Sequence, residues 1–236
     1  MGGMGRVFDG GYAEYTCVPA RQVIPFESDL PWPIIGAIPE MLQTAQGSLT
    51  IGLDIRPGQS LLIRGGTSSV GMAAAILAKR AGLTVLASTR NEAKRESLAS
   101  IDVDHVLIDD GNLASAVRRI VPGGVDAALE LVGSPTLRDT LHATRVHGVC
   151  FTGMLSNQWT IPDFYPIDYI PRGVRLTSYI GGAADLPGSV LQEFLQAVSD
   201  GTATVPTGKV YALDDIVQAH TDMEENRVSG KLVDTT

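Results

Sequence analysis

Residues 59–82 read QSLLIRGGTSSVGMAAAILAKRAG, which is the pattern of a strand, a tight glycine turn and a helix. The apolar run Leu61–Ile63 predicts a strand that is buried on both faces. Apolar residues then recur at helical spacing from Val70 to Ala81, and Gly82 stands where a helix C-cap is expected. With the strand-like residues 83–88 that follow, the stretch predicts a βαβ unit.

The turn carries the pattern Gly66-x-Ser68-x-x-Gly71, which is the dinucleotide-binding fingerprint with serine at its second glycine. Gly66 is expected to make the turn, a small residue at 68 lets backbone N–H groups approach a pyrophosphate, and Gly71 lets helix and strand pack closely. Because the pattern follows a predicted strand and opens a predicted helix, it predicts a dinucleotide site. The residues expected to line this site are Gly65, Gly66, Thr67, Ser68, Ser69, Val70 and Gly71.

The end of the second strand predicts which nicotinamide cofactor binds. Enzymes that use NAD keep an Asp or Glu about 20 residues past the first glycine, where the carboxylate binds the ribose hydroxyls. This chain has Ser88, Thr89 and Arg90 there, followed by Lys94. An acid would repel a 2′-phosphate, whereas arginine can bind it through two N–H groups, so the sequence predicts NADPH. The alternative is that Arg90 and Lys94 are only charges at a solvated helix start.

Strands and helices continue to alternate after this unit. Further strands are predicted at residues 105–108, 125–131, 148–153 and 174–179, with helices between them and another at 186–200. Six strands with intervening helices predict an α/β Rossmann domain over residues 59–201, a doubly wound six-stranded parallel sheet with helices on both faces. Residues 159–172 contain three prolines and are expected to form a substrate-side loop.

The remaining residues, 1–58 and 202–236, differ in character from this domain. Their predicted elements are strands at 10–18 and 19–25, a helix at 34–49 with Pro39 near its first turn, strand-like residues at 204–211, a helix at 213–226 and a strand at 230–233.

Four short motifs along the chain carry a family resemblance. They are Gly10-Gly11-Tyr12-Ala13-Glu14-Tyr15, Ile38-Pro39-Glu40 with Thr44-Ala45, Pro57-Gly58-Gln59, and Arg64-Gly65-Gly66-Thr67-Ser68-Ser69-Val70-Gly71. In combination they resemble the medium-chain dehydrogenase/reductase superfamily, and within it the zinc-independent quinone oxidoreductase-like branch. The resemblance implies that residues 1–58 and 202–236 belong to a GroES-like, β-rich catalytic domain. Members carry a longer segment before Gly10, so we expect this chain to lack most of that domain.

The resemblance also implies functional residues outside the glycine turn. Those expected to border the nicotinamide are Thr44, Val132, Gly133, Gly153, Met154 and Tyr179, and Lys231 is expected near the phosphates. For Val132, Met154 and Tyr179, ordinary core packing is an equal alternative. The resemblance further implies a homodimer, in which the strand Val174–Ile180 pairs near a twofold axis and so removes an exposed sheet edge.

Glu40 has two interpretations. Zinc-dependent relatives place their third catalytic zinc ligand near this position, and a glutamate can bind zinc through oxygen. The interpretation we favour is a carboxylate in the first turn of a helix, where it meets the positive end of the helix dipole. Cys17 and Cys150 are far apart and the four histidines have no HxxxH or HExxH spacing, so no metal is predicted.

Composition narrows the range of partners. With 236 residues and a net charge of −8, the chain is not expected to bind nucleic acid or an anionic membrane. It has no apolar run of the ~20 residues that span a bilayer and no recognisable signal peptide, which predicts a cytoplasmic protein.

These features together predict an NADPH-dependent oxidoreductase that reduces a quinone or the C=C bond of an α,β-unsaturated carbonyl. No catalytic side chain is assigned, because hydride transfer depends on positioning more than on a strong acid or base. The alternatives are a zinc-type alcohol dehydrogenase and a dinucleotide-binding module without turnover. Because the predicted catalytic domain is incomplete, we expect the chain to bind NADPH but to be weak or inactive as a reductase.

Overall fold

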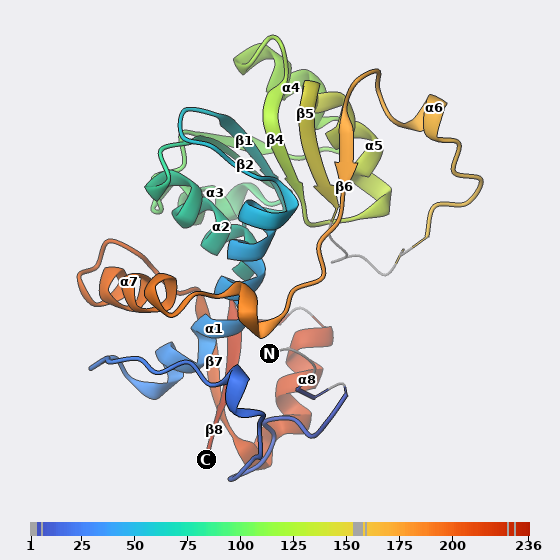
Figure 1. Ribbon diagram of the computed structural model, residues 1–236. Helices are drawn as coiled ribbons and strands as arrows, with labels where there is room; N and C mark the ends of the chain where they lie inside the picture. The colour runs from blue at the N-terminus through green and yellow to red at the C-terminus, as the bar shows by residue number, and fades with distance from the viewer. Residues whose placement is uncertain (1–3, 6, 153–157, 159, 226, 229) are drawn as a thin grey trace. The chain divides into compact units, whose positions relative to one another are not determined.

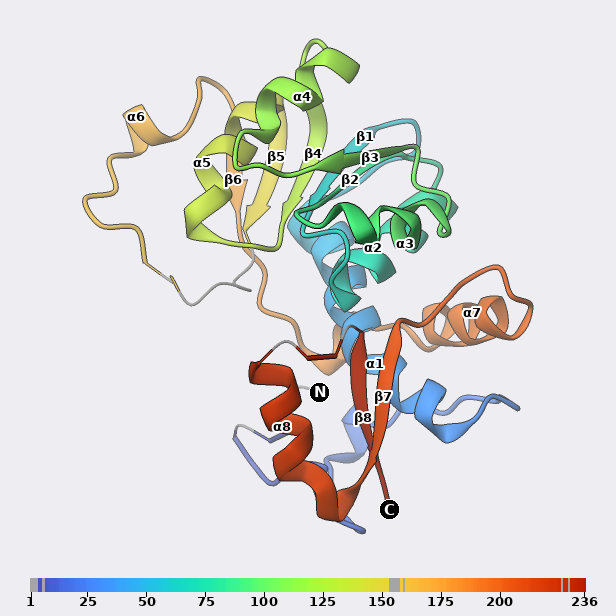
Figure 2. The same ribbon diagram turned by 180° about the vertical axis from the view of Figure 1, so that it is seen from behind.

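A computed structural model of the chain describes residues 4–5, 7–152, 158, 160–225, 227–228 and 230–236 (Figures 1 and 2). The chain divides into two compact units. The larger unit is Ala45–Ile180, and the smaller unit consists of Met1–Thr44 and Gly181–Thr236. These limits differ from the predicted domain limits of 59–201, because residues 45–58 group with the larger unit and residues 181–201 with the smaller one.

The larger unit is built on a six-stranded parallel sheet with the strand order β3-β2-β1-β4-β5-β6. Its strands are β1 Ser60–Arg64, β2 Thr84–Thr89, β3 His105–Ile108, β4 Val125–Glu130, β5 Thr144–Thr152 and β6 Arg175–Thr177. This confirms the predicted Rossmann-like sheet. The strand order reverses between β1 and β4, so the crevice in which such sheets bind ligands lies beyond the carboxyl ends of these two strands.

Helices cover both faces of this sheet (Figure 2). They are α2 Ser69–Arg80, α3 Arg95–Ala99 with the preceding 3₁₀ turn Glu92–Lys94, α4 Leu113–Ile120, α5 Ser134–Ala143 and the short α6 Pro166–Tyr169. The alternation of strand side chains decides which helices meet which face. Leu86 of β2 joins a cluster with α4 and α5, whereas the next residue, Ala87, lies close to Gly66, as does Leu98 of α3.

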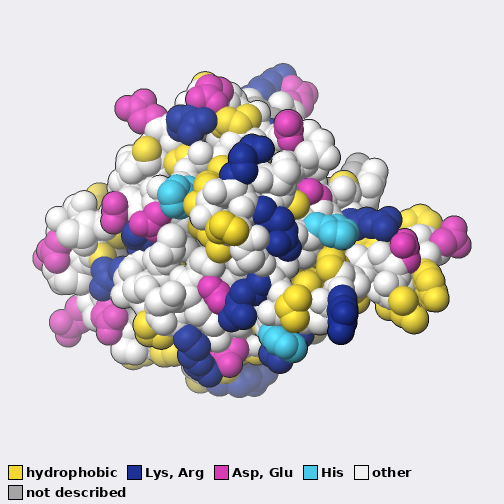
Figure 3. Space-filling model, turned by 90° about the horizontal axis from the view of Figure 1, so that it is seen from above, with side chains coloured by type: hydrophobic (Ala, Val, Ile, Leu, Met, Phe, Trp, Pro, Cys, Tyr) yellow, Lys and Arg dark blue, Asp and Glu magenta, His cyan; other side chains and the backbone are white. Residues whose placement is uncertain are grey.

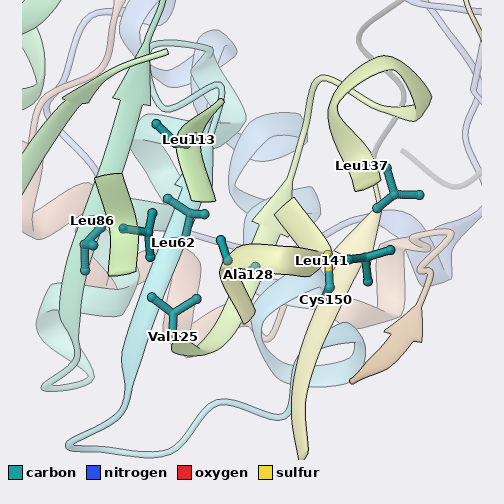
Figure 4. Close-up of a cluster of buried hydrophobic side chains, with 10 residues drawn as sticks. Leu62, Leu86, Leu113, Val125, Ala128, Leu137, Leu141 and Cys150 are labelled. Carbon is teal, nitrogen blue, oxygen red and sulfur yellow. The ribbon is translucent and has the colours of Figure 1, made fainter. Parts of the chain in front are cut away.

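One apolar core cluster lies between the sheet and the α4–α5 pair (Figure 4). Its fully buried members are Leu62, Leu86, Leu113, Val117, Val125, Ala128, Leu137, Leu141, Ala143 and Cys150. Each buried leucine contributes about 1.5–3 kcal/mol relative to an exposed one. Ile161, Tyr169 and Ile170 of the connection between β5 and β6 pack against this cluster. The segment predicted as a substrate-side loop therefore contributes side chains to the core.

The smaller unit contains a two-stranded parallel sheet of β7 Thr207–Ala212 and β8 Lys231–Thr235. Its helical elements are the 3₁₀ turns Ala20–Gln22, Ala183–Asp185 and Leu213–Asp215, the helices α7 Gly188–Ser199 and α8 Ile216–Glu224, and most of α1 Trp32–Gly47. A segment of π-helix, Ser48–Gly52, continues α1 in the larger unit.

The strands predicted at residues 10–18 and 19–25 were wrong. Residues 10–18 form bends and irregular backbone, and Ala20–Gln22 is a 3₁₀ turn. Strand character becomes a strand only where a neighbouring strand accepts and donates the ladder hydrogen bonds. Within the described part of the smaller unit the only paired strands are β7 and β8.

A buried carboxylate joins β7 to α8. Asp222 is 6% exposed and accepts hydrogen bonds from the Tyr211 hydroxyl at 2.7 Å and the Gln218 amide at 2.8 Å. Lys209 Nζ lies 3.3 Å and Arg227 Nη1 3.4 Å from the same carboxylate. The hydrogen bonds from Tyr211 and Gln218 lower the pKa of Asp222 to about 2.

Because the pKa of Asp222 is lower in the folded than in the unfolded chain, its stabilising effect is present above the unfolded value of 3.8 and is lost as pH falls through about 2. We therefore expect Asp222→Asn to lower the unfolding midpoint in urea at pH 7, and the difference from the wild type to shrink towards pH 2. Asp214→Asn, which changes an exposed carboxylate of the same region, is the control. A difference that stays constant between pH 7 and pH 2 would contradict this account.

Acidic and basic side chains are both spread over the face seen in Figure 3. In the part of the chain that the structure describes, every helix is too short or too polar to cross a lipid bilayer.

Candidate dinucleotide-binding site

The loop between β1 and α2 is tightly braced by its own hydrogen bonds. Ser68 caps α2, because its Oγ accepts from Gly71 N at 3.1 Å and donates to the Gly65 carbonyl at 2.8 Å. The Gly66 N–H donates to the carbonyl of Ser88 in β2 at 2.8 Å. The loop is therefore held to both neighbouring elements before any ligand binds.

Three glycines in this loop have different roles. The left-handed turn is made by Gly65, with φ of 83°, and not by Gly66 as the fingerprint suggested. A Cβ on Gly66 would lie 2.9 Å from the Cβ of Ala87, so Gly66 permits close packing. A Cβ on Gly71 would lie 2.6 Å from the Gly65 carbonyl oxygen, which leaves no room for a side chain between helix and loop.

Several backbone donors at the start of α2 are uncommitted. The N–H groups of Thr67, Ser69 and Val70 make no hydrogen bond to any described residue. The first N–H groups of a helix lack intrahelical partners, and with the positive end of the helix dipole they favour an anion. The residues of the glycine turn named from the sequence thus lie together in one loop with free donors.

At the end of β2, the four residues predicted to recognise the 2′-phosphate differ in exposure. Ser88 and Thr89 are buried: Ser88 Oγ accepts from Gly65 N at 3.4 Å, and Thr89 Oγ1 accepts from Asn91 N at 3.2 Å. They brace the loop and the strand end. Arg90 is exposed and Lys94 is half-buried, and neither side chain has an ion pair or hydrogen bond within the described residues.

Arg95 provides the contrast on the same segment. Its guanidinium binds Glu92 at 2.6 Å and the Val106 carbonyl at 3.1 Å. The hydrogen bond from Arg95 lowers the pKa of Glu92. Arg95 is therefore paired with a neighbour, whereas no described residue pairs with Arg90 or Lys94.

A buried ionic cluster lies at the strand-order reversal. Arg64, the last residue of β1, is fully buried and pairs in register with Glu130, the last residue of β4. Its Nε and Nη2 donate to the two oxygens of Asp109 at 2.7 Å each, and its Nη1 donates to Asp139 at 2.8 Å. Burial lowers the pKa of Arg64, but the hydrogen bond and charge of Asp109 with the charges of Glu130 and Asp139 outweigh it, so the pKa is raised.

Sequence reasoning missed this cluster. A charge such as Arg64 at the end of a buried apolar strand is nevertheless a signal in itself, because a buried charge must be paired. Its partners come from the end of β3 and from α5 and could not be identified from spacing along the chain.

Glu130 connects the cluster to the loop after β4. Its Oε1 accepts from Val132 N at 2.7 Å and Gly133 N at 3.0 Å, and its Oε2 accepts from the Thr140 hydroxyl. Gly133 has φ of 111° and ψ of −150°, a backbone conformation suited to glycine alone. Val132 is half-buried and Gly133 is buried.

Tyr179 lies in the larger unit beside Phe151, with ring centroids 6.5 Å apart. Its hydroxyl occupies the place that a Cβ on Gly47 would take, at 1.9 Å. Gly153 and Met154, also predicted to border the nicotinamide, lie outside the described residues.

The two predicted residues of the smaller unit are described by their own surroundings. Thr44 is a half-buried residue of α1. Lys231 begins β8, and its Nζ lies 2.7 Å from Glu40 Oε2.

Glu40 is in the middle of α1 and not in its first turn, because the helix begins at Trp32 and Pro33, rather than Pro39, occupies the first turn. Its carboxylate forms an ion pair with Lys231. Within the described ranges, no three His, Cys, Asp or Glu side chains form a group that could hold a metal ion. The described residues therefore do not fit a zinc ion.

Comparison with known proteins identifies the family. A family model described as zinc-binding dehydrogenase matches residues 101–233, which is more than half of the chain. The chain belongs to the zinc-binding dehydrogenase family. Its resemblance to the medium-chain dehydrogenase/reductase superfamily is thereby confirmed.

Individual relatives are identical to this chain at about a quarter of the aligned residues. A probable quinone oxidoreductase of Schizosaccharomyces pombe is 25% identical over 231 residues, which cover 95% of this chain and 69% of that protein. The highly reducing polyketide synthase cla2 of Cladosporium cladosporioides is 27% identical over 96% of this chain and 10% of its own length. The crystal structure of AibC superposes with a TM-score of 0.85 at 27% identity, covering 99% of this chain and 65% of AibC.

Proposed function

We propose that this chain is an NADPH-dependent oxidoreductase of the quinone or α,β-unsaturated carbonyl reductase type. The observation that carries the proposal is the group of uncommitted donors at the carboxyl edge of the sheet. They are the N–H groups of Thr67, Ser69 and Val70 and the unpaired side chains of Arg90 and Lys94. The similarity to a probable quinone oxidoreductase supports the substrate class.

Each group has a definite role in this proposal. NADPH, when bound, supplies the hydride. The free N–H groups at the start of α2 bind the pyrophosphate, and Gly66 and Gly71 allow the close packing that holds the loop in position for this. Arg90 binds the 2′-phosphate with help from Lys94. Ser88 and Thr89 act indirectly, by holding the turn from which Arg90 projects.

The remaining predicted residues enter the proposal through the family resemblance. We propose that Val132, Gly133 and Tyr179 border the nicotinamide, and the assignments of Thr44, Gly153, Met154 and Lys231 stay predictions. A cytoplasmic location, and the absence of nucleic acid and membrane as partners, stay predictions.

NADPH consumption separates this function from its two alternatives. The full chain is mixed with NADPH and a soluble quinone or an enone, and oxidation is followed by absorbance at 340 nm. Turnover with either acceptor, even at the low rate that the sequence analysis leads us to expect, supports the proposal. Oxidation of an alcohol with NADP⁺ that depends on added zinc would favour the alcohol dehydrogenase alternative, which the donor set around Glu40 disfavours. Tight NADPH binding without turnover would favour the binding module.

We also expect the chain to form a homodimer through β6. This strand is at the edge of the sheet, and Ile180 just beyond it is 95% exposed. Pairing two such edges would satisfy their free N–H and C=O groups. Light scattering at micromolar concentration should give the mass of two chains, and Ile180→Asp should give one. Val217→Asp, at an exposed position on α8, is the matched control and should leave the dimer intact. A monomeric wild type would contradict the expectation.

A further inference from the structure

The loop Leu131–Gly133 is placed to meet the second half of a dinucleotide. A doubly wound sheet binds the two mononucleotides on either side of the point where its strand order reverses. Here the glycine turn and Arg90 follow β1 and β2, on one side of that point. The other half of the ligand therefore falls beyond β4, and Leu131–Gly133 is the segment that follows this strand. This step rests on the proposed function.

All three N–H groups of this loop are held by buried groups. Leu131 N donates to the carbonyl of Arg64 at 3.1 Å, and those of Val132 and Gly133 converge on a single oxygen of Glu130. On the far side of the loop, the Gly133 carbonyl accepts from the N–H groups of Thr136 and Leu137 at the start of α5. The path of the loop is thus set by one carboxylate and one helix end.

The carboxylate is itself fixed on its other side. Glu130 is fully buried, its Oε2 accepts from the Thr140 hydroxyl, and Arg64 Nε lies 4.0 Å away. Thr140 Oγ1 in turn accepts from Arg64 Nη1 at 3.1 Å. Every partner of Glu130 is therefore a donor or a cation.

We propose that Glu130 is a positioning residue, which sets the backbone of Leu131–Gly133 against the nicotinamide half of NADPH. It acts through the N–H groups of Val132 and Gly133 and does not touch the cofactor. The Arg64 cluster holds the carboxylate in place for this role.

Glu130→Gln tests the role with little change in volume. Glutamine has one acceptor oxygen and one NH₂ group, so it cannot accept on both sides as the carboxylate does. If its oxygen faces the loop, its NH₂ group faces Thr140 and Arg64, and if it turns, the loop loses its acceptor. The variant should shift the loop while leaving the glycine turn and Arg90 unchanged.

The measurement compares two ligands by titration calorimetry on the full chain. NADPH carries both mononucleotide halves, whereas adenosine 2′,5′-bisphosphate carries only the phosphorylated adenosine half. Glu130→Gln should lower the affinity for NADPH at least tenfold and change the affinity for the bisphosphate less than twofold. Gly133→Ala should give the same selective loss, since φ of 111° strains any side chain there, and it serves if Glu130→Gln does not fold.

Asp126→Asn is the matched control. Asp126 lies at the opposite end of β4 and also accepts a backbone N–H, from Ser60 at 2.8 Å. The Asp126→Asn variant should bind NADPH and the bisphosphate as tightly as the wild type does. Equal weakening of both ligands by Glu130→Gln and Gly133→Ala, or no weakening of either, would overturn the positioning role alone. A wild-type chain that binds neither ligand would overturn the proposed function and this inference with it.

Discussion

Replacing Arg64 by leucine is expected to lower the free energy of unfolding by about 3–5 kcal/mol, the range found when one partner of a buried ion pair is removed. The guanidinium is fully buried and donates to Asp109, to Asp139, to the Thr136 carbonyl and to the Thr140 hydroxyl. Leucine leaves the carboxylates of Asp109, Asp139 and Glu130 close together without their cation. Burial already raises the pKa of Glu130, and the charge of Arg64 is among the groups that oppose this rise.

Urea denaturation of the full chain followed by far-ultraviolet circular dichroism measures the loss. Arg56→Leu is the control, because Arg56 also binds an aspartate, Asp54, but the two side chains are 67% and 68% exposed. An exposed pair of this kind contributes about 0–1 kcal/mol. If the free energy of unfolding fell by the same small amount in both variants, the buried Arg64 cluster would not stabilise the fold more than an exposed ion pair does.

The second large effect is expected on the preference for NADPH over NADH, when Arg90 is replaced. Wild-type protein should bind NADPH at least tenfold more tightly than NADH, a difference of about 1.4 kcal/mol. Arg90→Ala should remove most of this preference and leave the affinity for NADH nearly unchanged. The physical reason is that Arg90 is exposed and unpaired at the end of β2, so its charge is available to a 2′-phosphate.

Fluorescence titration with each cofactor measures this preference, and Arg95→Ala is the matched control. Arg95 lies five positions further along the chain, but its guanidinium is bound to Glu92 and to the Val106 carbonyl. Its loss should change the preference less than twofold. Equal affinities of the wild type for NADPH and NADH would refute the assignment of Arg90 as phosphate reader.

The zinc-binding name of the family and the residues of this chain point in different directions. The one carboxylate that resemblance placed near a zinc ligand, Glu40, is paired with Lys231. In the described ranges no other group of ligand side chains takes its place. Membership in the family therefore supports the dehydrogenase fold, and the described residues give no support to a metal step.

The sequence by itself determined the sheet and the glycine turn. The run Leu61–Ile63, the fingerprint and the helical spacing of 70–81 are local patterns. Each of them involves only residues that are close together in the sequence. Such patterns predict the folded structure well, because a strand that is apolar on both faces can bury both of them only in the interior of a sheet that helices cover. The position of Arg90 after β2 follows from the same local count.

Only the tertiary structure decided which of these residues are free and which are committed. Ser88 and Arg90 are two positions apart, yet Ser88 is buried against the glycine turn and Arg90 is exposed, because strand side chains alternate between faces only until the strand ends. The strands expected at 10–18 and 19–25 did not form, since a strand needs a partner that local sequence cannot supply. The Arg64 cluster likewise joins residues 45 and 75 positions apart, and its geometry exists only once β1, β3 and α5 have packed together.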